Sequence, residues 1–163
     1  QSDGIQPWIW DGKTLRLSRL GVPTPGRPSG VVVVAWTLRE NPSKPSESQL
    51  ERWQSPPVTT LDGWAKAWNM AELWGQMNPP ELKNGTHRLQ PTEKFQIYIF
   101  RDKSWTNPFS SDDLSASRAG GTPVTTKNQR PDGIRLVIAP SQVRGLAGDV
   151  TLDWASASLR MAP

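Results

Sequence analysis

Alternating polar and apolar positions over residues 95–100 give the clearest structural signal in the sequence, that of a β-strand. Successive side chains of a strand point to opposite faces of the sheet. One face would carry Phe95, Ile97 and Ile99, and the other Gln96, Tyr98 and Phe100. Both sets contain large apolar side chains, so the pattern predicts a strand that is covered on both faces and central to a sheet.

Other segments also have the alternation or the β-branched composition of strands. They are residues 5–10, 13–20, 31–40, 49–55, 134–139 and 150–154. Asp11-Gly12 is a strong two-residue hairpin signal between the first two of them. The polar residues 41–48 form a predicted turn that joins the next two strands into a second antiparallel hairpin.

Residues 62–77 have the periodicity of one amphipathic α-helix. Half of the helical wheel is apolar and is predicted to face the core: Trp64, Ala67, Trp68, Met70, Ala71, Trp74 and Met77. Thr60 or Asp62 can cap the start, and Asn78-Pro79-Pro80 ends the helix. A stripe of tryptophans could bind a ligand, but packing onto a sheet is the commoner role, and we interpret the stripe as core.

Together these elements predict an α+β fold of mostly antiparallel sheets with one amphipathic helix. The 163 residues fit a single domain, 1–163. Residues 81–90 are interpreted as a polar connection. Residues 103–130 lack any sustained period and are predicted to form a long loop, which is functional or disordered in most proteins.

Nine tryptophans stand against one tyrosine and three phenylalanines. Tryptophans at this density can stack on sugars or bases, although they more often fill a core. A carbohydrate-binding module would need Trp8, Trp10, Trp53 or Trp105 exposed and coplanar on one face. Trp105 is the best of these candidates, because it follows directly after a predicted strand.

The net charge of +4 raises the question of nucleic acid. The lysines and arginines are scattered along the chain, however, which is typical of a mildly basic solvated surface. We therefore predict no nucleic-acid partner. The chain has no cysteine, which excludes disulfides, thiolate metal sites and cysteine nucleophiles. It also has no run of about 18 apolar residues, the length that a membrane-spanning helix needs.

The sequence offers few groups for chemistry. His87 is the only histidine and is a poor candidate for a metal ligand without a second one. Asp112-Asp113 is the only tight acidic pair and lacks the alternating oxygen ligands of a calcium loop, and Asp102 is a further isolated carboxylate. Asn84-Gly85-Thr86 fits a glycosylation acceptor, a pattern that is common by chance. Hydrolase, phosphate-loop, zinc-protease and dinucleotide motifs are absent, so we predict no catalytic, cofactor-binding or metal-binding residue.

Several sequence blocks, in this order, resemble the minor pseudopilins of the type II secretion system, J type (the GspJ/PulJ family). They are WDGKTLRLSR (10–19), VVAWTLR (33–39), LERWQSPP (50–57), FQIYIFRDKSWTNPFSS (95–111), PDGIRLVI (131–138) and GDVTLDW (148–154). The blocks span most of the chain, and none of them is a catalytic signature. That family begins with a prepilin cleavage motif and a long apolar helix, and neither is present in these residues.

The resemblance implies a pilin-like head of antiparallel sheets without its N-terminal helix. It also implies a non-enzymatic subunit that joins the I-, K- and H-type minor pseudopilins at the tip of a periplasmic pseudopilus. There it would help to start the assembly that drives protein export across the outer membrane. The expected location is the periplasm, with anchoring in the inner membrane through the missing helix, and secreted proteins are possible further partners.

Other functions remain open at this point. A minor pilin of a type IV pilus shares the design of a helix and a sheet. A carbohydrate-binding β-sandwich would use exposed tryptophans, and nucleic-acid binding would follow from the positive charge and weaken steeply with salt.

Overall fold

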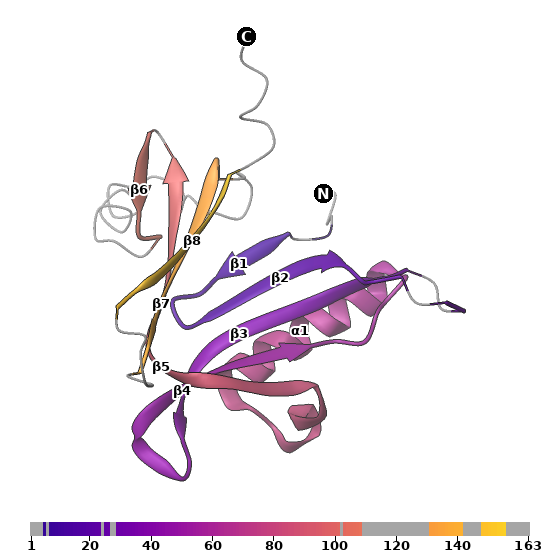
Figure 1. Ribbon diagram of the computed structural model, residues 1–163. Helices are drawn as coiled ribbons and strands as arrows, with labels where there is room; N and C mark the ends of the chain where they lie inside the picture. The colour runs from indigo at the N-terminus through magenta and orange to yellow at the C-terminus, as the bar shows by residue number, and fades with distance from the viewer. Residues whose placement is uncertain are drawn as a thin grey trace, which may run out of the picture. The chain divides into compact units, whose positions relative to one another are not determined.

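The computed structural model describes residues 5, 7–23, 25–26, 29–101, 103–108, 131–141 and 148–155. In chain order its elements are β1 (Trp8–Trp10), β2 (Thr14–Leu20), β3 (Val31–Asn41), β4 (Lys44–Gln54), α1 (Leu61–Met77), the 3₁₀-helix η1 (Pro80–Gly85), β5 (Thr86–Arg101), β6 (Ser104–Thr106), β7 (Gly133–Pro140) and β8 (Val150–Ala155). The α+β class, with antiparallel strands and one amphipathic α-helix in the described residues, is confirmed (Figure 1). None of the helices described here is long and apolar enough to cross a membrane.

The fold divides into two compact units, residues 1–91 and 92–163. Strand β5 belongs to both, since its first residues pair with β4 and its later residues pair with β7. The division by itself does not decide whether the units fold together, so a single domain remains a prediction.

The first unit is an antiparallel meander in which β1, β2, β3, β4 and the start of β5 pair in chain order. The predicted hairpin at Asp11-Gly12 is confirmed. Asp11 Oδ1 accepts hydrogen bonds from the backbone N–H of Lys13 at 2.9 Å and of Thr14 at 2.7 Å. Gly12 takes a φ of 92°, which glycine adopts without steric cost. The second hairpin is also confirmed, but β4 begins at Lys44, so the turn is shorter than predicted.

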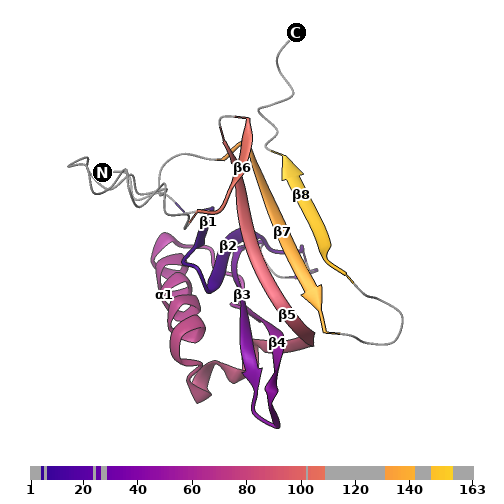
Figure 2. The same ribbon diagram turned by 90° about the vertical axis from the view of Figure 1, so that its left-hand side faces the viewer.

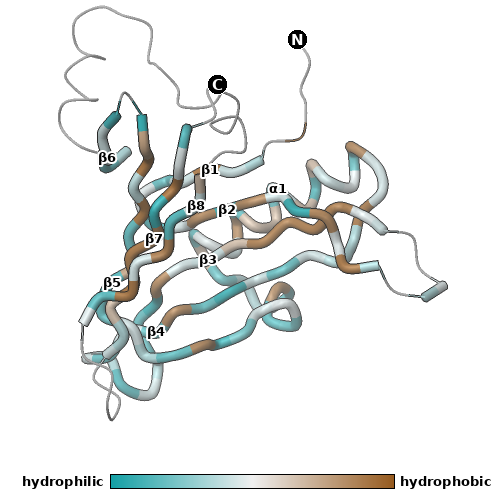
Figure 3. Tube along the Cα trace, turned by 45° about the horizontal axis from the view of Figure 1, so that its top comes forward, coloured by the Kyte–Doolittle hydropathy of each residue, from teal (hydrophilic) through white to brown (hydrophobic). Residues whose placement is uncertain are grey.

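Helix α1 covers one face of this sheet (Figure 1). The register places alternate residues of the strands on that face, where they join the helix in one buried cluster. Its members are Val33, Ala35, Trp53, Ala67, Trp68, Ala71, Trp74 and Leu82. Apolar runs in the strands, such as the valines that open β3, supply this core and part of the opposite sheet face (Figure 3).

The helix begins and ends as the sequence predicts. Thr60 is the N-cap, and its Oγ1 accepts a hydrogen bond from Gly63 N at 3.1 Å. Asn78 ends the helix in the left-handed conformation. The predicted core face is wrong at Met70 and Met77, which are exposed. The buried strip centres on Ala71 and includes Gly75, so both methionines lie roughly 100° or more around the helix from its centre.

Charged side chains are also buried between helix and sheet. Glu51 forms ion pairs with Arg39 at 3.1 Å and with Arg88 at 3.4 Å, and its side chain is only 6% exposed. Arg39 lies over the Trp74 ring and donates a hydrogen bond to the Trp74 carbonyl. Burial lowers the pKa of Arg39, and the charge of Glu51 opposes that shift. The negative charge of Glu51 therefore compensates the cost of burying the Arg39 guanidinium.

The second unit consists of the later part of β5 with β6, β7 and β8 (Figure 2). Strand β5 has neighbours on both edges near its end, because Phe100 is paired with Trp105 of β6 and with Gly133 of β7. The central position of this strand is thus confirmed. One of its faces is buried, with Phe95, Ile97 and Ile99 inside, while the other is only half-buried, so the prediction of two covered faces is partly wrong.

Two predictions about this region need correction. Residues 81–90 are not a polar connection, because η1 ends at Gly85 and β5 already begins at Thr86. Those polar residues form a strand because they pair with β4, opposite Glu51 and Trp53 among others. The sequence also did not predict β6, a short strand that folds back on β5. Most of the predicted loop, residues 109–130, lies outside the described residues.

Gly75 of α1 is required by close packing against β2. A Cβ atom at this position would lie 2.5 Å from Thr14 Oγ1 and 2.8 Å from its Cγ2, and Thr14 is buried. We expect Gly75→Ala to lower the free energy of unfolding by up to about 2 kcal/mol. Overpacking costs about 1–3 kcal/mol, which outweighs the gain of about 1 kcal/mol in helix propensity. Urea unfolding measures the change. The control is Asn69→Ala on the exposed side of α1, and equal stability of the two variants would contradict the packing argument.

Removal of the buried carboxylate should cost more. Glu51→Gln leaves the Arg39 guanidinium without its counter-charge, so we expect a loss of about 3 kcal/mol in the free energy of unfolding. Glu47→Gln is the matched control, because it makes the same change in β4 at an exposed ion pair with Lys44. Such pairs contribute about 1 kcal/mol or less. A similar, small effect of both changes in thermal unfolding would show that Glu51 is not needed.

Candidate functional site

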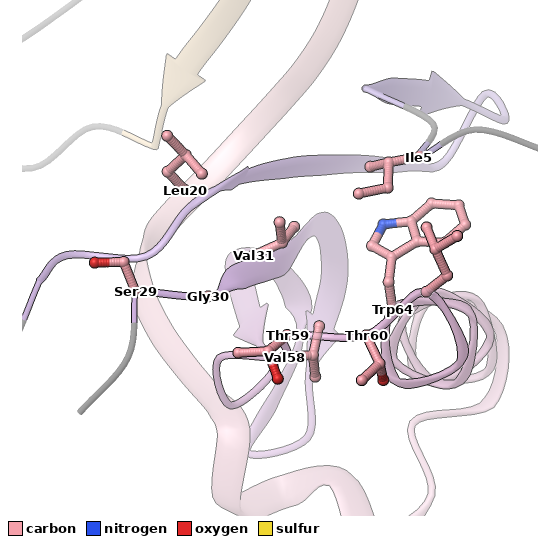
Figure 4. A pocket seen from close by; sticks show the side chains of 10 residues that line it. Ile5, Leu20, Ser29, Gly30, Val31, Val58, Thr59, Thr60 and Trp64 are labelled. Carbon is pink, nitrogen blue, oxygen red and sulfur yellow. The ribbon is translucent and has the colours of Figure 1, made fainter.

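The first unit contains a hollow between the end of β2, the start of β3 and the start of α1 (Figure 4). Ten described residues line it: Ile5, Leu20, Ser29, Gly30, Val31, Val58, Thr59, Thr60, Leu61 and Trp64. They come from segments far apart in the sequence. Because the lining residues come from distant segments, no single stretch of the sequence predicts the site.

A backbone bridge brings the two sides of the hollow together. Val31 N donates to the Val58 carbonyl at 2.8 Å, and Val58 N donates to the Val31 carbonyl at 2.8 Å. Gly30 permits this approach, since a Cβ at this position would lie 2.7 Å from the Val58 carbonyl oxygen. The segment before α1 is thereby fixed against the first residues of β3.

Trp64 forms one wall, and its orientation is fixed by a polar contact. Its indole Nε1 donates to Ser18 Oγ of β2 at 2.9 Å, and its ring packs against Trp68 with centroids 5.4 Å apart. The Trp64 ring lines the hollow together with Ile5 and Val31 (Figure 4). The hydrogen bond to Ser18 fixes the orientation of the Trp64 ring before any ligand or partner protein binds.

The rim of the hollow is apolar and open to solvent. Leu20 is 76% exposed, Leu61 62% and Ile5 42%. Single exposed leucines are common, but three large apolar side chains around one depression mark a contact surface. The hollow has a volume of about 230 Å³. Pockets for drug-sized molecules begin at roughly 300 Å³, and an apolar cavity of roughly 150 Å³ holds benzene. Its size therefore suits an apolar side chain of a protein.

None of the ten described lining residues has a titratable side chain. The polar groups are the hydroxyls of Ser29, Thr59 and Thr60, and Thr60 is already engaged as the helix cap. Acid–base and nucleophilic catalysis need an activated group within hydrogen-bond reach, and these residues do not provide one. The arrangement can bind apolar surface.

A second apolar surface lies in the other unit, along β8. Val150, Leu152 and Trp154 alternate along this strand and are each about half exposed, and the other residues of β8 are exposed as well. Their neighbour Asp153 points to the other face, where it forms a two-bond ion pair with Arg135 at 2.7 and 2.8 Å. That hydrogen bonding lowers the pKa of Asp153 and raises the pKa of Arg135.

The tryptophans considered for carbohydrate binding do not form one platform. Trp8 and Trp10 share a face of the first unit's sheet, opposite the side that α1 covers, whereas Trp53 is buried under α1. Trp105, in the other unit, is half-buried between Phe100, with ring centroids 5.2 Å apart, and the Arg135 guanidinium, 4.2 Å from its ring centroid. The structure thus gives no positive support for a sugar site at these residues.

The other candidates remain separate as well. His87 is exposed on β5, paired with Arg52 in the strand register, and Asn84 is exposed in η1. Within the described residues, no group of three or more acidic or histidine side chains could hold a metal ion. Asp102, Asp112 and Asp113 lie outside the part of the chain that the structure describes.

Comparisons with known proteins give one similarity of interest. No protein-family model matches the chain, and no curated protein matches it. Among solved structures, it is similar to a chain of the GspK–GspI–GspJ complex from the type 2 secretion system of enterotoxigenic Escherichia coli. The sequence identity is 14%, the TM-score is 0.47, and the match covers 87% of this chain and 66% of that chain. The chain thus spans slightly less than two thirds of the solved chain, and at these values the similarity establishes neither family nor function.

Proposed function

We propose that this protein is a non-enzymatic minor pseudopilin subunit that assembles with other pseudopilins. The observation that carries the proposal is the apolar hollow of the first unit, with its exposed leucine rim and its lack of titratable lining groups in the described residues. The ordered sequence blocks that resemble the J-type family support the same function.

The hollow suits a partner that inserts one apolar side chain. Exposed Leu20 and Leu61 stand at its rim, while Trp64 is fixed by its bond to Ser18. Binding would bury the rim without reorganising the wall, and burial of one leucine contributes about 1.5–3 kcal/mol. The centre of a protein interface is apolar, and its anchor side chains fill pockets on the partner.

The finer parts of the proposal follow from the family resemblance. The partners are the I-, K- and H-type minor pseudopilins, and the subunit belongs at the tip of a type II secretion pseudopilus. There it helps to initiate assembly for export across the outer membrane. We also propose a periplasmic location, with the full-length protein anchored in the inner membrane by an N-terminal helix.

The rim leucines provide the test. We expect Leu20→Gln and Leu61→Gln each to weaken binding of purified I- and K-type pseudopilins about tenfold, because each loses about 1.4 kcal/mol or more of apolar burial. Met77→Gln is the matched control, since Met77 is 69% exposed at the opposite end of the same helix. Size-exclusion chromatography shows complex formation, and calorimetry measures the dissociation constants.

The possible results distinguish an error in the proposed function from an error in the proposed contact surface. Failure of the unmodified protein to co-elute with any pseudopilin would contradict the proposed function. Tight binding that the leucine variants leave unchanged would preserve the function and move the contact surface away from the hollow, with β8 as the next surface to alter.

A further inference from the structure

Two arginines of the first unit share a single neutral acceptor. Arg19 Nη2 donates to Gln54 Oε1 at 3.0 Å, and Arg52 Nη2 donates to the same oxygen. Both guanidinium groups therefore reach a common point. An amide oxygen carries only a partial negative charge. Two guanidinium groups would form stronger hydrogen bonds with a fully charged acceptor in the same place.

The strand register builds this arrangement on the sheet face away from α1. Arg19 of β2 is paired with Val32 of β3, and Gln54 of β4 is paired with Val34, so Arg19 reaches across β3 to the amide. Arg52 lies one position along the same face of β4. The group is therefore carried by three neighbouring strands, and its geometry does not depend on a loop.

No carboxylate of the described residues balances the positive charge at this place. Within the described residues, Arg16, Arg39, Arg88 and Arg135 each have a carboxylate within 4.0 Å, but Arg19 and Arg52 have none. Burial lowers the pKa of Arg52, and the charge of Arg19 lowers it further. Two like charges that converge with no carboxylate of the described part of the chain beside them leave a place for an anion.

Both guanidinium groups are also partly held in position. The Arg52 guanidinium carbon lies 5.8 Å from the centre of the Trp36 ring, and Arg19 Nη1 donates to the Leu20 carbonyl at 3.2 Å. The described hydrogen bonds of Arg52 use only one of its nitrogens, so donors remain on a guanidinium that is already oriented.

We propose that Arg19, Arg52 and Gln54 form a binding site for an oxyanion, a carboxylate or a phosphate group. The anion takes the place of the Gln54 oxygen between the two guanidinium groups. The Gln54 side-chain amide then rotates, and its N–H₂ group donates to the same anion. This site lies on the opposite sheet face from the hollow, and it does not depend on the pseudopilin assignment.

The test is an NMR titration of the 163-residue protein with two probes at constant ionic strength, because salt screens exposed charges. The probes are inorganic phosphate and N-acetyl-glutamate amide, and the signals are the Gln54 side-chain amide and the arginine Nε–H groups. We expect saturable shifts. Arg19→Gln and Arg52→Gln should each weaken binding about tenfold, the effect of losing one charge-assisted hydrogen bond.

Lys83→Gln is the control for net charge, because Lys83 is exposed on η1 and takes no part in the cluster. Arg19 is exposed, so its replacement should leave the fold intact. Saturation with phosphate alone, with the glutamate probe alone or with both supports the site and identifies the source of the oxyanion. No saturable shift with either probe, or an equal loss of binding in Lys83→Gln, would overturn the proposal.

Discussion

The close contact between α1 and β2 is the constraint on which the rest of the first unit depends. Gly75 lies directly against buried Thr14, with no room for a Cβ atom between them. The helix can therefore approach the sheet closely enough for Trp74 and Trp68 to reach the core beside Trp53. A larger residue at position 75 would push the helix away from the sheet and leave empty space around these tryptophans. Such space is costly, because a protein interior is packed as densely as an organic crystal.

The same contact decides which charges are buried. With α1 held against the sheet, Arg39 lies over the Trp74 ring and reaches the carbonyl of that residue, near the end of the helix. A guanidinium in that place is favoured by the partial negative charge of a helix C-terminus, and Glu51 compensates its burial from the sheet side. At the other end of α1, Trp64 is held by Ser18 and becomes a wall of the hollow. Core and candidate site are thus two consequences of one helix position.

Local signals in the sequence were enough for most elements. The turn at Asp11-Gly12, the valines that open β3 and the periodicity of α1 depend on neighbouring residues only, and the structure confirms each of them. The start of β5 could not be predicted in this way, because Thr86 and the polar residues after it form a strand through pairing with β4. Met70 was misplaced for a related reason: the sequence shows which side of a helix is apolar but not how wide the contact with the sheet is.

The two candidate sites were hidden for the same physical reason. Leu20 and Trp64 meet at the hollow only because the bridge between Val31 and Val58 joins distant segments, and Arg19 meets Gln54 only because the register places both beside β3. Long-range pairing is not encoded in any window of the sequence.

The end of β2 then serves both faces of the sheet. Successive side chains of a strand point to opposite sides, so Leu20 lines the hollow on the helix side while Arg19 points to the other. The Leu20 carbonyl also accepts a hydrogen bond from Arg19, which ties the two positions through the backbone. Side-chain replacement at Arg19 or Leu20 leaves this strand backbone in place. The apolar and the charged surfaces can therefore be altered one at a time, and a partner that used both would have to contact the sheet around the end of β2.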